Sequence, residues 1–384
     1  MPHKVLFCAT VDYHFEKFHL PYMKWFKEQG WEVHVAANGE LALPYVDRKF
    51  NVPIARSPFR AGNVKAYREL KEIIDTHHYR LVHCHTPVGG LLARLAARQA
   101  RKQGTHVLYT AHGFHFCKGA SPLNWAVFYP IERWLARYTD CLLTINEEDY
   151  RLAVRHRFPA RRIERVHGVG VDAERYRPAS ASRKRELRER MGYGPDDFLL
   201  FYAAEFNANK NQQLLIRALA LAKDRMPNAR LLLAGDGPLL DMCKAMSSRL
   251  QVDHMTRFLG YRDDIDRLLP ACDVAVASSL REGLPVNIME AMACALPVVA
   301  TKNRGHDELV DDGRNGWIVD RDQEQQLAER LVAAYNDPAL RRRLGEAGRL
   351  KIHRQYTVQH VLAEKKTIYL SLMGEVETVL WATR

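Results

Sequence analysis

Residues 273–301 read DVAVASSLREGLPVNIMEAMACALPVVAT, and this stretch indicates the fold of the chain. Two apolar runs rich in β-branched residues, at 273–279 and 296–301, flank a segment with helical spacing. A strand, a helix and a second strand in this order form the repeating unit of a parallel sheet. We therefore expect an α/β protein.

The same alternation extends in both directions and predicts two Rossmann-like domains. Ligands of such sheets bind beyond the carboxyl ends of the strands, so two facing sheets would create an interdomain cleft. We place the domains at 1–170 and 179–356, and we expect a last helix, 357–384, to pack back on the first domain. The runs of strand length lie at 3–10, 31–37, 81–86, 106–112 and 141–146, then at 198–204, 229–237, 256–261, 273–279 and 296–301.

The charge of the chain is concentrated in its first half. Residues 1–168 carry 25 Lys and Arg against 15 Asp and Glu, which is +10 of the formal +12. Such a surface attracts nucleic acid, anionic lipid headgroups or a phosphorylated substrate, and charge alone does not separate these partners. The seven cysteines include no CxxC pair, which predicts free thiols in a reducing cytosol. Neither a signal peptide nor a membrane-spanning run is expected.

Within the opening stretch, Glu282 and Glu290 raise the question of an acid–base pair. Glu282 belongs to the loop after the strand, and Glu290 lies roughly 6 Å along a helix that begins near Val286. Gly283 allows close approach of a ligand to the backbone, Pro285 suits a helix start, and the first helical turn binds anions. These features favour a phosphate-bearing ligand, although spacing alone leaves open that both glutamates are solvated.

A resemblance covers essentially the whole chain. Glu282 and Glu290, set in SSLREGLPVNIMEAMACALPVVAT and followed by ELVDDGRNGWIV, resemble the signature of family 4 glycosyltransferases of the GT-B fold. The first half, with HCHTPVGGLLARLAARQA and LYTAHGFHFCKGA, is similar to EpsD-type exopolysaccharide glycosyltransferases of Bacillus-like bacteria. This resemblance implies a hexosyltransferase with a nucleotide-diphosphosugar donor.

The resemblance implies roles for residues of the second domain. Glu290 would hold the ribose, Lys210 would neutralise the diphosphate near Val286, and Glu282 would hold the donor sugar. Many relatives carry an Arg five or six residues before the lysine, where this chain has Glu205. That departure leaves more of the phosphate charge to Lys210. Further donor contacts are expected from Gly283, Leu284, Pro285, Glu205, Asn209 and Tyr261.

In the first domain the resemblance singles out His112, which ends a predicted strand in TAHGFHF. A histidine here contacts the donor sugar near the reacting centre in that family, whereas a lone strand-end histidine is more often structural. His115 is a weaker candidate. The loop after the first strand departs from the Gly-Gly pair of many relatives and offers Asp12, Tyr13 and His14 as tentative ligands of acceptor or phosphate.

Several metal-like and cofactor-like patterns are expected to be structural, so we expect no metal and no cofactor. Asp264 and Asp266 resemble a DxD motif but lie where a helix would be capped, and Asp320 and Asp322 lie in a predicted turn. The strand sequence His83-Cys84-His85 puts two histidines on one face without evident further ligands. HGVGVD and AGDGPLL lack the third glycine of the dinucleotide fingerprint.

An apolar row with interspersed Arg and aromatic residues suggests contact with a membrane. Leu123, Val127, Ile131, Leu135 and Tyr138 follow helical spacing on the basic domain, which suits an anionic headgroup layer. An ordinary core-facing helix is the alternative. We expect a cytoplasmic, peripheral protein on the inner face of the plasma membrane.

Taken with the resemblance, these patterns predict a retaining, metal-independent transfer of a sugar in exopolysaccharide biosynthesis. The implied donor is UDP-N-acetylglucosamine and the implied acceptor is an undecaprenyl-diphosphate-linked saccharide. Two alternatives are a UDP-sugar 2-epimerase of the same fold and a nonenzymatic nucleic-acid-binding protein. No nucleic-acid-binding module is recognised, so we expect no nucleic-acid partner.

Overall fold

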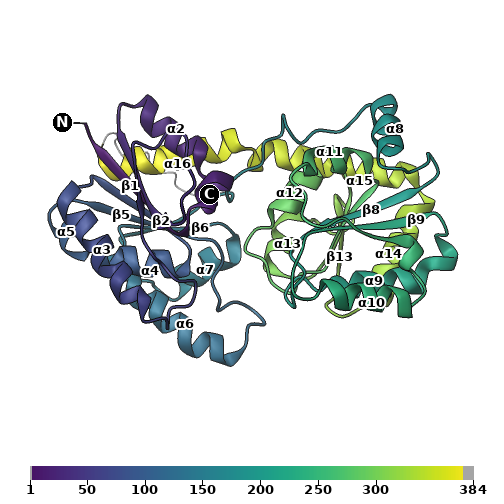
Figure 1. Cartoon of the computed structure of the whole chain (residues 1–384), viewed down its shortest axis with the longest axis horizontal. Coiled ribbons are helices and arrows are strands. Elements are labelled where there is room, and N and C mark those ends of the chain that lie inside the picture. The colour runs from purple at the N-terminus through teal and green to yellow at the C-terminus, as the bar shows by residue number, and fades with distance from the viewer. Residues whose placement is uncertain (1, 375–384) are drawn as a thin grey trace. The chain divides into compact units, whose positions relative to one another are not determined.

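The computed structural model describes residues 2–374, and the chain divides into two compact units (Figure 1). Unit 1 contains residues 2–169 and 359–374, and unit 2 contains residues 170–358. Each unit is built around one sheet whose strands all pair in parallel. The α/β architecture with two parallel sheets is therefore confirmed.

The sheet of unit 1 has seven strands in the order β3-β2-β1-β4-β5-β6-β7. Its central strands are buried on both faces, as expected for a parallel sheet covered by helices. The strands are β1 (Lys4–Val11), β2 (Glu32–Asn38), β3 (Arg48–Asn51), β4 (Leu81–His85), β5 (His106–Ala111), β6 (Cys141–Thr144) and β7 (Arg162–Arg165).

Helices connect these strands in the βαβ manner. Leu70 and Ile74 of the longest connecting helix are buried and belong to the unit 1 core. The helices are α1 (Tyr13–Phe18), α2 (Leu20–Glu28), α3 (Gly62–His77), α4 (Pro87–Ala96), α5 (Arg98–Lys102), α6 (Pro122–Leu135) and α7 (Glu147–Arg155).

The sheet of unit 2 has six strands in the order β10-β9-β8-β11-β12-β13. The strands are β8 (Phe198–Ala203), β9 (Ala229–Ala234), β10 (Thr256–Phe258), β11 (Val274–Ala277), β12 (Val298–Thr301) and β13 (Gly316–Val319). The helices are α8 (Ala181–Arg190), α9 (Gln212–Ala222), α10 (Leu240–Arg249), α11 (Ile265–Leu268), α12 (Val286–Ala293), α13 (Arg304–Leu309), α14 (Glu324–Asn336) and α15 (Pro338–Lys351).

All ten strands predicted from the sequence form, and three further strands were not predicted. β3, β7 and β13 each have four residues and lie at the edges of the two sheets. The sequences RKFN and RIER of β3 and β7 are partly exposed and carry charges, so they lack the apolar run that marks a central strand.

The last described helix, α16 (Val358–Met373), packs in unit 1 although it follows unit 2 in the sequence. The Tyr369 hydroxyl lies 2.8 Å from His83 Nδ1, and Arg162 Nη1 donates to Ser371 Oγ at 2.7 Å. Residues 375–384 of the predicted terminal helix lie outside the described residues. All seven cysteines are buried free thiols, as predicted.

Candidate active site

The loop between β11 and α12 in unit 2 is held by hydrogen bonds at its base. Ser278 Oγ donates to the Lys210 carbonyl at 2.7 Å. The Ser279 carbonyl accepts from Thr301 Oγ1 at 2.8 Å and from Asn303 Nδ2 at 2.9 Å. These contacts join the loop to the segments that follow neighbouring strands. They therefore fix the backbone that carries Glu282.

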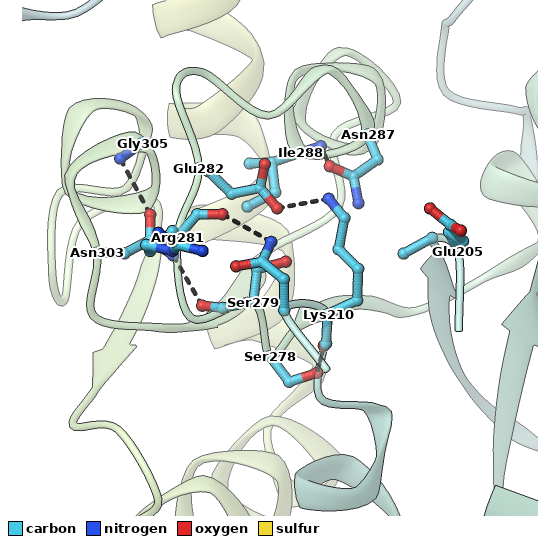
Figure 2. A network of polar contacts seen from close by, with 12 residues as sticks. Glu205, Lys210, Ser278, Ser279, Arg281, Glu282, Asn287, Ile288, Asn303 and Gly305 are labelled. Atoms are coloured by element: carbon cyan, nitrogen blue, oxygen red, sulfur yellow. Dashed lines mark hydrogen bonds and ion pairs between the residues drawn. The ribbon is translucent and has the colours of Figure 1, made fainter. Parts of the chain in front are cut away.

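Lys210 and Glu282 form the central contact of this site. Lys210 follows β8, and its Nζ lies 2.5 Å from Glu282 Oε1 (Figure 2). The two side chains are 23% and 14% exposed, so the pair is accessible to a ligand yet partly shielded from water. The family resemblance implies phosphate contact for Lys210 and sugar contact for Glu282, and the structure brings the two side chains together.

The backbone of Glu282 is fixed by a segment that the sequence reading did not single out. Arg304 Nε donates to the Glu282 carbonyl at 2.9 Å. A Cβ on Gly305 would lie 2.7 Å from Glu282 Cβ, so glycine is needed at this close approach. The sequence carries this segment as NRG (303–305), one residue after the end of β12, but only the fold shows which loop it contacts.

Helix α12 begins at Val286, as predicted, with Pro285 at its N-cap. Asn287 Nδ2 donates to the Ala203 carbonyl at 3.0 Å, which ties the start of α12 to the end of β8. The N–H groups of a first helical turn lack intrahelical partners and carry partial positive charge. Leu284 and Pro285 are buried and Gly283 is half-buried, so this segment presents mainly backbone.

Glu290 lies one turn into α12 and is half-buried. Burial raises the pKa of Glu290 to about 7, although a hydrogen bond from Tyr176 and the charge of Arg175 act in the opposite direction. Arg175 Nη2 also lies 3.0 Å from Asp266 Oδ1. Tyr176 and Arg175 come from the segment between the two predicted domains, so the sequence did not indicate their interaction with Glu290.

A pocket of about 320 Å³ lies beside this site at the carboxyl ends of β8 and β9. Glu205 and Tyr261 line it, and Glu205 Oε2 accepts from Asn207 Nδ2 at 3.0 Å. In Figure 2 the Glu205 carboxylate lies apart from the Lys210 ammonium. Asn209 instead supports the loop, because its Nδ2 donates to the Arg281 carbonyl at 3.0 Å. The pocket lining is Ala203, Ala204, Glu205, Ala234, Gly235, Asp236, Tyr261, Arg262 and Ile265.

The two acidic patterns that resemble DxD motifs have structural partners or turn geometry. Asp264 precedes α11 at the N-cap position, but its carboxylate pairs with Arg262 and makes no capping bond. Asp266 pairs with Arg175. Asp322 lies in a turn with φ of 56°.

In unit 1, His112 belongs to a group of four histidines, here called the histidine cluster: His14, His19, His85 and His112. His14 Nε2 lies 3.1 Å from His19 Nε2, and His85 Nδ1 lies 3.2 Å from His112 Nε2. Burial lowers the pKa of all four imidazoles, to about 4 for His14. The sequence shows no further ligands beside His85, whereas the fold brings three histidines from other segments close to it.

The other predicted residues of unit 1 divide between structural and pocket positions. Asp12 is buried, and its Oδ2 contacts Lys49 Nζ at 2.6 Å and accepts from the Leu41 N–H at 2.8 Å. Burial would raise the pKa of Asp12, but these bonds outweigh it and hold the pKa below the usual value. Tyr13, His14 and His115 line a separate pocket.

This unit 1 pocket has a volume of about 450 Å³ and largely apolar walls. Val127, Phe128 and Ile131 of α6 form one wall. Val127 and Ile131 belong to the predicted apolar row and thus face a pocket. Leu123, at the start of α6, is 70% exposed. None of the described helices is long and apolar enough to cross a membrane.

Comparison with known proteins places the chain in a family. The model described as "Glycosyl transferase 4-like domain" matches residues 20–168, and "Glycosyl transferases group 1" matches residues 183–351. A protein of Bacillus subtilis (strain 168) named "Putative glycosyltransferase EpsD" is 52% identical over 97% of this chain and 98% of its own length. The chain is a GT-B glycosyltransferase. The predicted family and enzyme class are confirmed.

Two more distant proteins resemble this glycosyltransferase. The Escherichia coli protein named "UDP-Gal:alpha-D-GlcNAc-diphosphoundecaprenol alpha-1,3-galactosyltransferase" is 27% identical over 76% of each chain. The crystal structure of Anabaena Alr3699/HepE in complex with UDP and glucose has a TM-score of 0.78 at 21% identity. It covers 96% of this glycosyltransferase and 100% of its own chain, which shows the shared fold.

Proposed function

We propose that this glycosyltransferase moves N-acetylglucosamine from UDP-N-acetylglucosamine to an undecaprenyl-diphosphate-linked saccharide, with retention and without a metal, in exopolysaccharide biosynthesis of a biofilm-forming cell. The observation that supports the proposal best is the convergence of Lys210, Glu282 and the start of α12 beside half-buried Glu290. These groups offer a cation, backbone donors and two carboxylates within one site, which matches the chemistry of a nucleotide sugar.

Each part of the donor has a proposed partner in unit 2. The ribose hydroxyls would donate to Glu290, and the diphosphate would lie between Lys210 and the N–H groups at Val286. The sugar would contact Glu282 and the backbone from Gly283 to Pro285. The pocket lined by Glu205 and Tyr261 would receive the uracil, and Asn209 would keep the Glu282 loop in place.

Arrival of the donor would change the partner of Lys210. The ammonium now neutralises Glu282, and a diphosphate would share it. Transfer breaks the bond between the sugar C1 and the diphosphate oxygen, so negative charge develops on the leaving group. Lys210 and the α12 start would stabilise that charge. The acceptor hydroxyl would attack from the same face and give its proton to the leaving phosphate, while His112 would contact the sugar.

The acceptor would bind unit 1. Tyr13, His14 and His115 place polar groups in a pocket whose largely apolar walls also include Arg56 and Glu132, which suits a saccharide on a lipid carrier. The net charge of +10 over residues 1–168 would attract an acceptor diphosphate and anionic lipid headgroups. Exposed Leu123 and Trp134 on α6 would aid peripheral contact with the cytoplasmic face of the membrane.

A panel of nucleotide sugars tests the donor assignment by thermal stabilisation, with and without EDTA. Ligand that binds only the folded state raises the melting temperature. We expect UDP-N-acetylglucosamine to give the largest shift and EDTA to leave it unchanged. No shift with any UDP-sugar would contradict the donor class, and loss of the shift in EDTA would contradict metal independence.

Product analysis separates transfer from epimerisation. With UDP-N-acetylglucosamine and a polyprenyl-diphosphate-linked saccharide, we expect UDP release and an acceptor longer by one sugar with retained configuration. Incubation with UDP-N-acetylglucosamine alone should leave the donor unchanged. A new UDP-linked epimer would instead indicate a 2-epimerase.

A further inference from the structure

The histidine cluster lies at the carboxyl end of three neighbouring strands of unit 1. His85 is the last residue of β4, His112 directly follows β5, and His14 and His19 follow β1 on and after α1. Because β1, β4 and β5 are adjacent in the sheet, four imidazoles from distant parts of the sequence meet at one edge. His112 and His14 have roles in the proposed transfer, whereas His19 and His85 have none, so an ion in this cluster would act outside the transfer chemistry.

We propose that the histidine cluster is a binding site for a divalent transition-metal ion such as Zn²⁺. Four ring nitrogens, one from each histidine, all lie within 4.8 Å of one another. A tetrahedral zinc ion with Zn–N bonds of about 2.0–2.1 Å has ligand nitrogens about 3.3–3.4 Å apart. The Nε2 atoms of His14 and His19 lie 3.1 Å apart, and His85 Nδ1 lies 3.2 Å from His112 Nε2. Binding an ion would therefore require only that the two pairs move closer to each other.

The second ring nitrogens of two members have no competing partner. His19 Nδ1 and His85 Nε2 are buried and have no hydrogen-bond partner among the described residues. They belong to rings whose other nitrogens, His19 Nε2 and His85 Nδ1, make the 3.1 and 3.2 Å contacts, so they would carry the ring protons while the paired nitrogens bind the ion.

The composition of the cluster selects the class of metal. Imidazole nitrogens suit Zn²⁺, Co²⁺, Ni²⁺ and Cu²⁺, whereas Mg²⁺ and Ca²⁺ prefer oxygen ligands. The nearby buried side chain of Lys365 acts against a second cation. His14 also lines the unit 1 pocket, which provides a path for the ion.

The test is titration of tag-free, EDTA-treated full-length protein with Co²⁺, followed by visible absorption. Cobalt bound by four nitrogens in a tetrahedron gives intense bands, whereas cobalt on surface histidines gives weak ones. We expect one equivalent to produce intense bands, and Zn²⁺ to displace it. His14→Gln and His85→Gln should each weaken binding at least tenfold, since even residues that only support ligands contribute about that much.

Two control variants keep the assignment specific. His254→Gln changes an exposed histidine of unit 2, and His360→Gln changes the other group that could hold a metal, His167, His360 and Glu364. Both should keep the intense bands. Weak bands only, or bands that survive in both cluster variants, would overturn the proposal, as would bands lost in His360→Gln. The inference does not rest on the transferase proposal, because the cobalt titration is carried out without donor or acceptor.

Discussion

At the carboxyl end of the unit 2 sheet, Lys210 and Glu282 form a 2.5 Å ion pair beside the start of α12, whereas the same end of the unit 1 sheet gathers four neutral imidazoles. Both edges belong to parallel sheets with helices between the strands. This end of a parallel sheet is where ligands generally bind, and the side chains placed there decide which ligands fit. Fixed charges favour an anionic diphosphate, while neutral nitrogen donors favour a sugar hydroxyl or a soft cation.

The largest expected effect comes from removing the fixed cation of unit 2. Lys210→Ala should lower the transfer rate about 10²- to 10³-fold, because the leaving diphosphate loses a preorganised charge. Steady-state UDP release measures the change. Lys244→Ala, on the exposed surface of α10, is the matched control and should keep the wild-type rate. Equal rates for Lys210→Ala and the control would remove Lys210 from the proposed mechanism.

Loss of an imidazole from unit 1 should affect turnover and leave donor binding intact. His112→Asn should lower kcat about 10²-fold, as expected when a group near the reacting centre is lost, while the shift of melting temperature by UDP stays that of the wild type. His78→Asn is the control, since His78 is exposed and its φ of 51° suits Asn. An equal loss of UDP binding in His112→Asn would contradict the assignment of UDP binding to unit 2 alone.

A smaller effect is expected at the ribose position of unit 2. Glu290→Ala should weaken UDP binding by about tenfold to a hundredfold, the range of a hydrogen bond to a charged group. Titration calorimetry with UDP measures it, with Glu346→Ala on the exposed face of α15 for comparison. An unchanged affinity for UDP in Glu290→Ala would show that Glu290 does not bind the ribose.

The smallest effect concerns stability and pH. Burial raises the pKa of Glu290 from 4.5 to about 7, so the folded state holds a proton that the unfolded state releases. Stability of the wild type therefore falls as pH rises from about 4.5 to 7, by about 3 kcal/mol at most. Glu290→Gln has no ionisable carboxyl at this position and does not lose this stability as pH rises. The melting temperature of Glu290→Gln should therefore exceed that of the wild type by more at pH 8 than at pH 5. A difference that does not vary with pH would contradict the burial of an ionisable carboxyl.

The central strands and the loop that carries Glu282 were predictable, because long apolar runs and the Glu282 to Glu290 spacing are local in sequence. The contacts that build the sites were not. Lys210 and Glu282 are 72 positions apart, and Tyr176 reaches Glu290 from a segment whose sequence suggests only a linker. The histidine cluster draws on three strand ends, and its assembly depends on strand order, which periodicity does not specify.

Helix α16 has a consequence for the synthesis of the chain. Its buried Tyr369 bonds His83, and its Met373 carbonyl accepts from Arg80, so unit 1 is incomplete until residues near the end of the chain are made. Unit 2, by contrast, is complete at residue 358. Domains usually fold in the order in which they emerge from the ribosome. Here the unit that begins first finishes last, and a truncation after residue 168 would leave the sheet of unit 1 without the helix that covers His83.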